Sequence, residues 1–190
     1  MIGKKMEHDF DHPSFWFIAE DRLKYLLRGT YYGKDIQCLN LKGDESVLDF
    51  GCGGGTASRY VMDFLSERGR LLGVDTSAYW MNIASRRLKK YPNATFKVGD
   101  IGTMNLPTSS MDVVMTFHVL HHIESVDRLP VLRVLAHLLK EEGRFYIRER
   151  TQASHGIPLG ELTSLLSRAG LREINHSLDK AEYRGLFSSG

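Results

Sequence analysis

Residues 46–55 read Ser-Val-Leu-Asp-Phe-Gly-Cys-Gly-Gly-Gly, and this stretch decides the fold. Its first half is mostly apolar and favours a short buried strand, whereas the glycines favour a tight turn that a ligand can approach closely. Helical spacing follows from about residue 56 to residue 68, and Gly69 is expected to end that helix. A strand that enters a helix through a glycine-rich turn is typical of the first unit of a cofactor-binding α/β sheet.

Strands and helices alternate along the rest of the chain. Further strands are expected at 70–75, 94–98, 111–117 and 143–148, and helices at about 77–90, 126–139 and 160–169. This alternation predicts right-handed crossovers and a parallel sheet. The last two strands, 171–178 and 182–188, have no helix between them, so they are expected to form an antiparallel hairpin on that sheet.

Length and composition favour one globular domain. The chain has 190 residues, of which 42% are hydrophobic and 25% charged, which excludes disorder or a coiled coil as the whole-chain structure. Residues 1–39 are expected to form an N-terminal arm and cap helix, and residues 40–190 the main domain. An additional helix is expected from Phe15 to Leu27, ended by Gly29, with little regular pattern over 31–42.

Charge and cysteine content exclude several kinds of protein. A net charge of +2 is too small to predict binding to nucleic acid as the main activity. Two cysteines, Cys38 and Cys52, are too few for a disulfide framework or a cysteine-based metal site. The apolar runs are too short for a membrane span or a signal peptide, so the expected location is the cytoplasm.

Two acidic residues stand where later strands end. Asp75 ends the second strand and can accept both hydroxyls of a ribose, while Asp100 follows the third and could accept from an adenine amino group. The alternative is that each aspartate alone only caps a helix or a turn. The glycine spacing does not fit a dinucleotide fingerprint, because the sixth position counted from Gly51 is Thr56. The Gly-Lys-Ser/Thr ending of a phosphate-binding loop is missing as well.

Residues 47–55 resemble the first motif of class I S-adenosylmethionine-dependent methyltransferases. Similar later motifs lie at 73–81, 96–107, 111–123, 138–145 and 165–171, and the one at 111–123 resembles the branch that acts on small molecules. The resemblance implies a Rossmann-like, doubly wound sheet of seven strands in the order 3-2-1-4-5-7-6, with strand 7 antiparallel and an N-terminal helical extension. It also implies that S-adenosylmethionine is the cofactor.

The resemblance assigns roles to individual positions. Gly51 and Gly53 would face the methionine part of the cofactor, Asp49 would support the turn, and Asp75 would hold the ribose. The remaining cofactor-binding positions implied are Asp100 and Ile101 around the adenine, Phe117 beside the sulfonium, and the neighbouring residues Cys52 and Thr76.

Three histidines, His118, His121 and His122, follow the fourth strand. Histidine titrates near neutrality and can act as a general base, and His118 is the catalytic candidate. The alternative is that these side chains only fix their own loop. A zinc site at this spacing lacks a fourth local ligand, so no metal is expected.

The acceptor of the methyl group is expected to be a small molecule. The chain lacks the Asn/Asp-Pro-Pro-aromatic motif of enzymes that methylate amino groups of DNA or glutamine, and it has no basic-aromatic patch for RNA. The segment from Arg150 to Leu159 is short, so the pocket is expected to be open, or covered by the N-terminal arm or by a second chain of a homodimer. The aromatic side chains of the N-terminal segment are the expected lid: Phe10, Phe15, Trp16, Phe17, Tyr25, Tyr31 and Tyr32.

Two other functions compete with methyl transfer. A non-catalytic cofactor-binding module or partner subunit would explain the small cap and the uncertain base. An NAD(P)-linked reductase is disfavoured, because the dinucleotide fingerprint and a Tyr-x-x-x-Lys pair are both missing.

Overall fold

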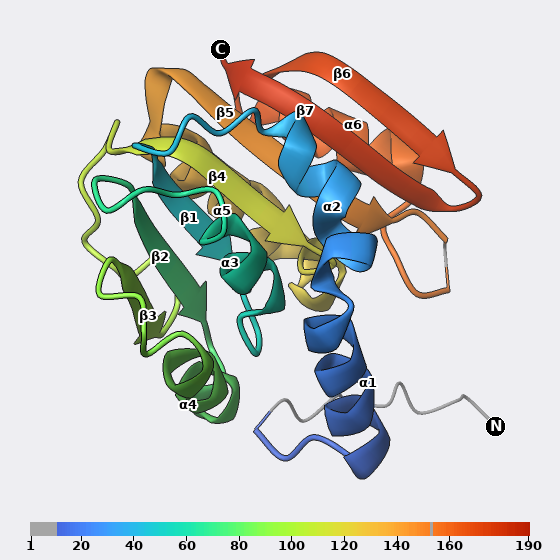
Figure 1. Cartoon of the computed structure of the whole chain (residues 1–190). Helices are drawn as coiled ribbons and strands as arrows, with labels where there is room; N and C mark the ends of the chain where they lie inside the picture. Colours follow the sequence, from blue (N-terminus) through green and yellow to red (C-terminus); the bar gives the residue numbers. More distant parts are fainter. Residues whose placement is uncertain (1–10, 153) are drawn as a thin grey trace, which may run out of the picture.

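A computed structural model describes residues 11–152 and 154–190. Phe10, which was expected in the lid, lies outside the described residues. The described chain forms a single seven-stranded sheet with helices on both faces (Figure 1). The strands are β1 (Ser46–Phe50), β2 (Arg70–Asp75), β3 (Ala94–Val98), β4 (Met111–Phe117), β5 (Leu139–Arg150), β6 (Leu171–Asp179) and β7 (Glu182–Ser189).

The strand order is β3-β2-β1-β4-β5-β7-β6, as predicted. Strands β3, β2, β1, β4 and β5 pair in parallel, and β7 runs antiparallel to both β5 and β6. Every residue of the inner strand β1 is buried, because helices cover both faces of the sheet there. Strand β5 is longer than the predicted range 143–148, since a register shift opposite Met111 lets Leu139 join the pairing.

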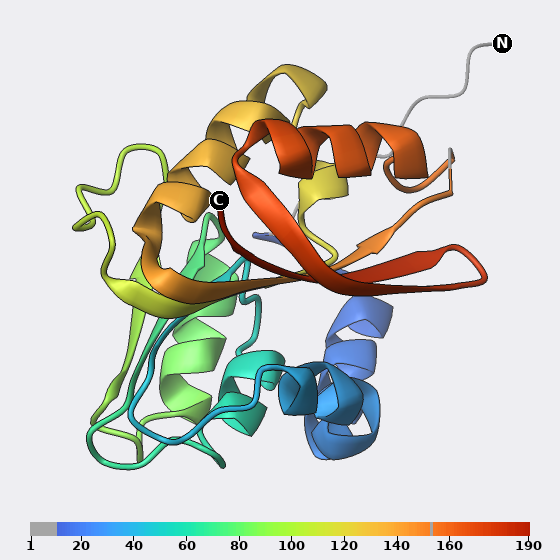
Figure 2. The same cartoon turned by 90° about the horizontal axis from the view of Figure 1, so that it is seen from above.

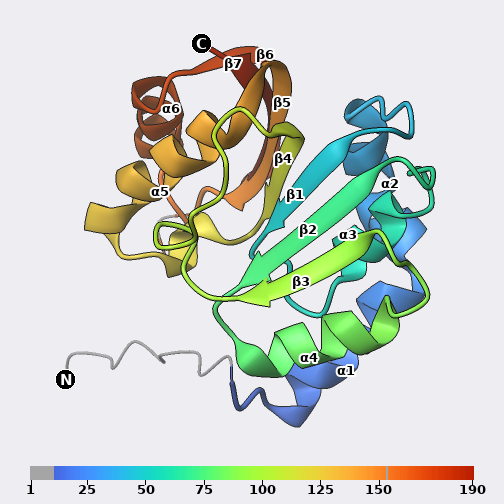
Figure 3. The same cartoon turned by 90° about the vertical axis from the view of Figure 1, so that its left-hand side faces the viewer.

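The helices form two layers. Helices α5 (Ser125–Leu138) and α6 (Leu159–Arg168) cover one face of the sheet (Figure 2). The other face carries α2 (Arg28–Cys38), α3 (Thr56–Val61) and α4 (Ala78–Arg87), with α1 (Phe15–Leu26) extending beyond the strand ends (Figures 2 and 3). Helix α3 is shorter than the expected range 56–68, because turns follow it from Met62 onward.

The prediction for the N-terminal segment was wrong in one respect. Helix α1 ends at Leu26, and a second helix, α2, passes through Gly29 and Gly33 where no regular structure was expected. Gly33 lies against the Tyr60 hydroxyl, 3.6 Å from the position of a Cβ. Tertiary packing therefore overrides the weak helical propensity of this stretch.

Helix α2 belongs to the hydrophobic core. Ile36 and Leu39 are 1% and 0% exposed and pack in a cluster with Val47 of β1 and Val113 of β4. Helix α1, in contrast, has no buried residue. The division of the chain at residues 39 and 40 stays a prediction, but α2 buries Gly33, Asp35 and Ile36.

Within residues 11–152 and 154–190, no helix is long and apolar enough to cross a membrane. The same residues contain no group of three or more histidine, cysteine, aspartate or glutamate side chains placed to hold a metal ion.

Candidate cofactor and acceptor site

The glycine turn after β1 is fixed to the end of β2 through its backbone. The amides of Gly51 and Cys52 both donate to the carbonyl oxygen of Val74, at 2.8 and 3.2 Å. The φ angles of Gly51, Gly53 and Gly55 are +71°, +50° and +75°. These are left-handed conformations, which glycine adopts without the steric cost that a Cβ brings.

One side of the turn is closed and the other is open. A Cβ added at Gly51 would lie 2.3 Å from the Cγ2 atom of Val119, so the loop after β4 packs directly on this glycine. A Cβ added at Gly53 would meet no described atom within 4 Å. The backbone of Gly53 is therefore the part of the turn that a cofactor can approach.

Asp75 connects this turn to the next helix. Its Oδ2 atom accepts from the Gly53 amide and its Oδ1 atom from the Ser77 amide, each at 2.9 Å. Burial raises the pKa of this carboxyl group, whereas the backbone hydrogen bonds lower it. The backbone of Thr76 donates to this carboxylate as well, and since an ionised carboxylate has about four acceptor positions, Asp75 keeps capacity for a ribose hydroxyl. Thr76 is exposed next to it, and Ser77 rather than Thr76 caps α4.

Asp49 and Cys52 lie beneath the turn. Asp49 is 1% exposed, and its Oδ2 atom accepts from the Ser58 hydroxyl of α3 at 2.5 Å. Burial raises the pKa of Asp49 to about 7. The thiol of Cys52 is buried 3.9 Å from the sulfur of Met81, and burial raises its pKa too. The structure thus shows that Asp49 and Cys52 pack beneath the glycine turn, against Ser58 and Met81. Their direct contact with a cofactor stays a prediction.

The other predicted cofactor positions lie at the same edge of the sheet. Asp100 is exposed, and its Oδ1 atom accepts from the Gly102 amide at 2.8 Å, whereas Ile101 is 1% exposed. Phe117 ends β4 and packs edge-on against Tyr32 of α2, with ring centroids 5.0 Å apart. Figure 3 shows β1, β2 and β3 ending together beside α1 and α4.

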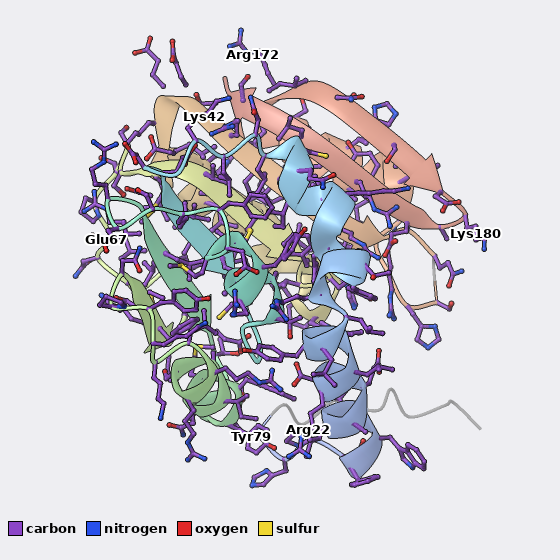
Figure 4. All side chains as sticks on the ribbon, viewed as in Figure 1. Arg22, Lys42, Glu67, Tyr79, Arg172 and Lys180 are labelled. Atoms are coloured by element: carbon purple, nitrogen blue, oxygen red, sulfur yellow. The ribbon has the colours of Figure 1, made fainter. Side chains whose placement is uncertain are left out.

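Helix α1 covers the turn through contacts that sequence reasoning missed. Asp21 pairs with Arg87 of α4 at 2.6 Å, and Arg87 also donates to the carbonyl oxygen of Gly54 at 2.9 Å. The ring of Phe17 contacts Trp80 edge-on at 5.6 Å, whereas the predicted lid residue Trp16 is 79% exposed. In Figure 4, the labelled Arg22 and Tyr79 mark this end of the molecule, and Lys42 and Arg172 mark the opposite end.

His118 follows β4 directly and has a φ of +58°. Its amide donates to the carbonyl oxygen of Arg148 at 2.8 Å, and its Nε2 atom lies 2.6 Å from Oε1 of Glu182 on β7. Burial lowers the pKa of the His118 imidazole, although the contact with Glu182 raises it. His118, which follows Phe117 in the sequence, is therefore given a carboxylate partner by the pairing of distant strands.

Glu182 belongs to a network of ion pairs that joins α2 to β5 and β7. Arg148 lies between two carboxylates: its Nη1 atom donates to Asp35 at 2.9 Å, and its Nε atom lies 2.9 Å from Glu182. Arg184 contacts the same two carboxylates. Asp35, which is 3% exposed, also accepts from the Tyr146 hydroxyl. No local sequence motif predicts this network, because its members are far apart in the sequence.

The other two histidines lie in the 3₁₀ helix η1 (Leu120–His122). The Nδ1 atom of His121 lies 2.6 Å from Oε1 of Glu149, a residue that is 1% exposed. The ring of His122 contacts that of His121, with centroids 3.9 Å apart. His121 is thus tied to the end of β5, as a residue that fixes its own loop would be.

The fold defines a class of protein: a Rossmann-like α/β domain with a glycine turn after β1 and aspartates at the ends of β2 and β3. A family model described as a methyltransferase domain matches residues 47–143, about half of the chain. The chain belongs to this methyltransferase family, whose cofactor is S-adenosylmethionine.

Two relatives show what the chain is similar to, and the second of them is named a methyltransferase. An uncharacterised 37.1 kDa protein in transposon TN4556 of Streptomyces fradiae is 30% identical over 78% of this chain and 42% of its own length. YcgJ, an uncharacterised methyltransferase of Bacillus subtilis, is 25% identical over 87% of this chain and 64% of its own. The chain thus spans 42% and 64% of the length of these two relatives.

A solved structure shows the same fold at lower identity. The TehB-like S-adenosylmethionine-dependent methyltransferase of Corynebacterium glutamicum superimposes with a TM-score of 0.71 and 19% identity, covering 90% of this chain and 97% of that one.

Proposed function

We propose that this protein transfers a methyl group from S-adenosylmethionine to a small-molecule acceptor. The observation that carries the proposal is the left-handed glycine turn whose open position, Gly53, is bonded to the strand-end carboxylate of Asp75. Such a turn lets a cofactor lie against the backbone, and the carboxylate offers acceptors to ribose hydroxyls. These residues fit the cofactor of the family.

The protein's own part in the reaction is binding and alignment. The bound cofactor supplies an electrophilic methyl group on a sulfonium. Asp75 and the glycine turn would hold it, Asp100 and Ile101 would frame its adenine, and Phe117 would pack near the reacting atoms. Alignment of two reactants in one site can account for a large part of a rate enhancement, so few acid or base groups are required.

A small acceptor agrees with the net charge of the whole chain and with the short connection after β5. The net charge of +2 provides little attraction for a nucleic acid backbone. Only residues 151–158 connect β5 to α6, so no large insertion is present there to bind a macromolecule. The acceptor would enter between α1 and the ends of β4 and β5.

The cofactor is tested by calorimetry with S-adenosylhomocysteine and NADH. We expect the first to bind and the second to give no heat. Asp75→Ala should weaken S-adenosylhomocysteine binding by about 1.5–3 kcal/mol, or roughly 10- to 150-fold, because hydrogen bonds to a charged group are lost. The matched control is Asp179→Ala, an exposed carboxylate at the end of β6. Tight NADH binding, or an unchanged affinity in folded Asp75→Ala, would contradict the assignment.

A non-catalytic cofactor-binding module is the competing function. It predicts the same calorimetry but no turnover. The two are separated by incubating the protein with S-adenosylmethionine and a fractionated pool of small metabolites, and measuring release of S-adenosylhomocysteine. Release that depends on one fraction supports the enzyme, and its absence with every fraction supports the module.

A further inference from the structure

His118 is held in a strained conformation by two separate anchors. A left-handed conformation costs a non-glycine residue roughly 1–2 kcal/mol, and such strain persists only where surrounding contacts impose it. Here the backbone amide is bonded to Arg148 and the ring to Glu182, so both the main chain and the imidazole are fixed. The residue directly follows Phe117, at the strand end where the methyl acceptor is proposed to bind.

The contact with Glu182 determines which ring nitrogen carries the proton. Burial would raise the pKa of Glu182, but the hydrogen bond and charge of Arg148 outweigh it and lower that pKa. Glu182 is therefore an ionised acceptor, and the Nε2 atom of His118 must donate to it. In the neutral ring, Nδ1 is then the acceptor. Among the described residues, no side-chain or backbone group is bonded to Nδ1, and the side chain is 16% exposed.

We propose that Glu182 is a positioning residue that orients His118 as a base, with Nδ1 receiving a proton from the methyl acceptor. The inference rests on the proposed function and narrows its substrate class to acceptors whose methylated oxygen, sulfur or nitrogen carries a proton. As that atom bonds to the methyl carbon, the carbon–sulfur bond breaks and sulfur keeps the electron pair. The acceptor's proton moves to Nδ1, and Glu182 stabilises the resulting imidazolium.

Two carboxylates around His118 favour the imidazolium that it would form as a base. Glu182 and Glu149 favour its protonated form, and Arg148 opposes it. Asp35 and Arg184 complete the network around Glu182, in which two arginines balance two carboxylates. Within this balance, Glu182 is the carboxylate that contacts the imidazole of His118, so removing its charge changes the environment of His118 most directly.

The test compares Glu182→Gln with Glu173→Gln. The control removes the carboxylate from another histidine contact of the same length, His176–Glu173 at 2.6 Å, on the exposed strand β6. With the metabolite fraction that the wild type methylates, Glu182→Gln should lower kcat by roughly 10- to 100-fold. The acidic limb of its pH profile should also move to lower pH, because His118 loses an anion that raises its pKa. Neither change is expected in Glu173→Gln.

Three measurements keep a structural effect separate from a catalytic one. The affinity of Glu182→Gln for S-adenosylhomocysteine should stay within about twofold of the wild type, and ¹⁵N NMR of the histidine rings should show the Nε2–H form of His118 only in the wild type. Adding Glu182→Gln to His118→Asn should lower kcat no further, since Glu182 acts through His118.

The outcomes separate the inference from the proposed function. Turnover that is unchanged in Glu182→Gln, an unshifted pH profile, or an Nδ1–H form of His118 in the wild type would overturn the inference and leave methyl transfer standing. Absence of turnover by the wild type with every fraction would overturn both.

Discussion

The two halves of the functional edge are built in different ways. At the ends of β1 and β2, the backbone sets the geometry: three left-handed glycines and amides that donate to Val74 and Asp75. At the ends of β4, β5 and β7, side chains set it, through the carboxylates Asp35 and Glu182 and their arginines. The first half is set by residues that are close together in the sequence, whereas the second is assembled from residues that are far apart in it.

The largest effect on stability is expected when the ion-pair network of α2, β5 and β7 loses a buried carboxylate. Asp35→Ala removes a buried carboxylate that contacts Arg148 and Arg184, and it should lower the free energy of unfolding by about 3–5 kcal/mol. Urea denaturation measures it. The control Glu161→Gln breaks a partly exposed pair with Arg128 and should cost less than about 1 kcal/mol. Equal losses in the two variants would mean that the network contributes no more than a surface pair.

The next largest effect on stability is expected where the glycine turn packs against the loop after β4. Gly51→Ala places a Cβ at a φ of +71° and against Val119 of the β4 loop, so it should destabilise the fold by about 2–4 kcal/mol. Gly160→Ala, at a helical position of α6 with no described atom within 4 Å of the added Cβ, should be neutral or stabilising. Both are measured by urea denaturation. If Gly51→Ala cost less than about 1 kcal/mol, the loop and the turn would not be packed as described.

Asp49, beneath the glycine turn, is expected to make the free energy of unfolding depend on pH. Its pKa is about 7 in the folded protein and about 3.9 when unfolded, so the folded state keeps a proton that the unfolded state releases between these values. The contribution of Asp49 to stability should therefore fall as pH rises from 4 to 7, by on the order of 2–4 kcal/mol. The difference in unfolding free energy between wild type and Asp49→Asn isolates this group. A difference that does not vary with pH would show that Asp49 is ionised throughout.

The smallest effect concerns the two N-terminal helices. Helix α1 has no buried residue, whereas α2 buries Gly33, Asp35 and Ile36. Amides 15–26 should therefore exchange with solvent faster than amides 28–38, and S-adenosylhomocysteine should slow α1 more than α2 if α1 is a lid. Hydrogen exchange measures both. Strong protection of α1 without a ligand, unchanged on adding it, would make α1 a structural helix.

Local sequence determined most of the fold and the cofactor half of the site. The alternation of apolar strands with helices predicts a parallel sheet, and the missing helix between β6 and β7 predicts their hairpin, because each rests on short-range geometry. The glycine turn and the positions of Asp75 and Asp100 at strand ends could be read directly, since the carboxyl ends of parallel strands meet at one edge. The order of the strands needed the family resemblance as well.

Only the tertiary structure decided the acceptor half. His118 could be named from the sequence, but its partner Glu182 is 64 positions away and Arg148 is brought to both by strand pairing. Likewise, α2 was missed because its residues are weak helix formers, and Ile36 and Leu39 stabilise it only by packing on β1 and β4. Short-range geometry is encoded in neighbouring residues, whereas an ion pair or a packed helix face exists only once the sheet has brought distant residues together.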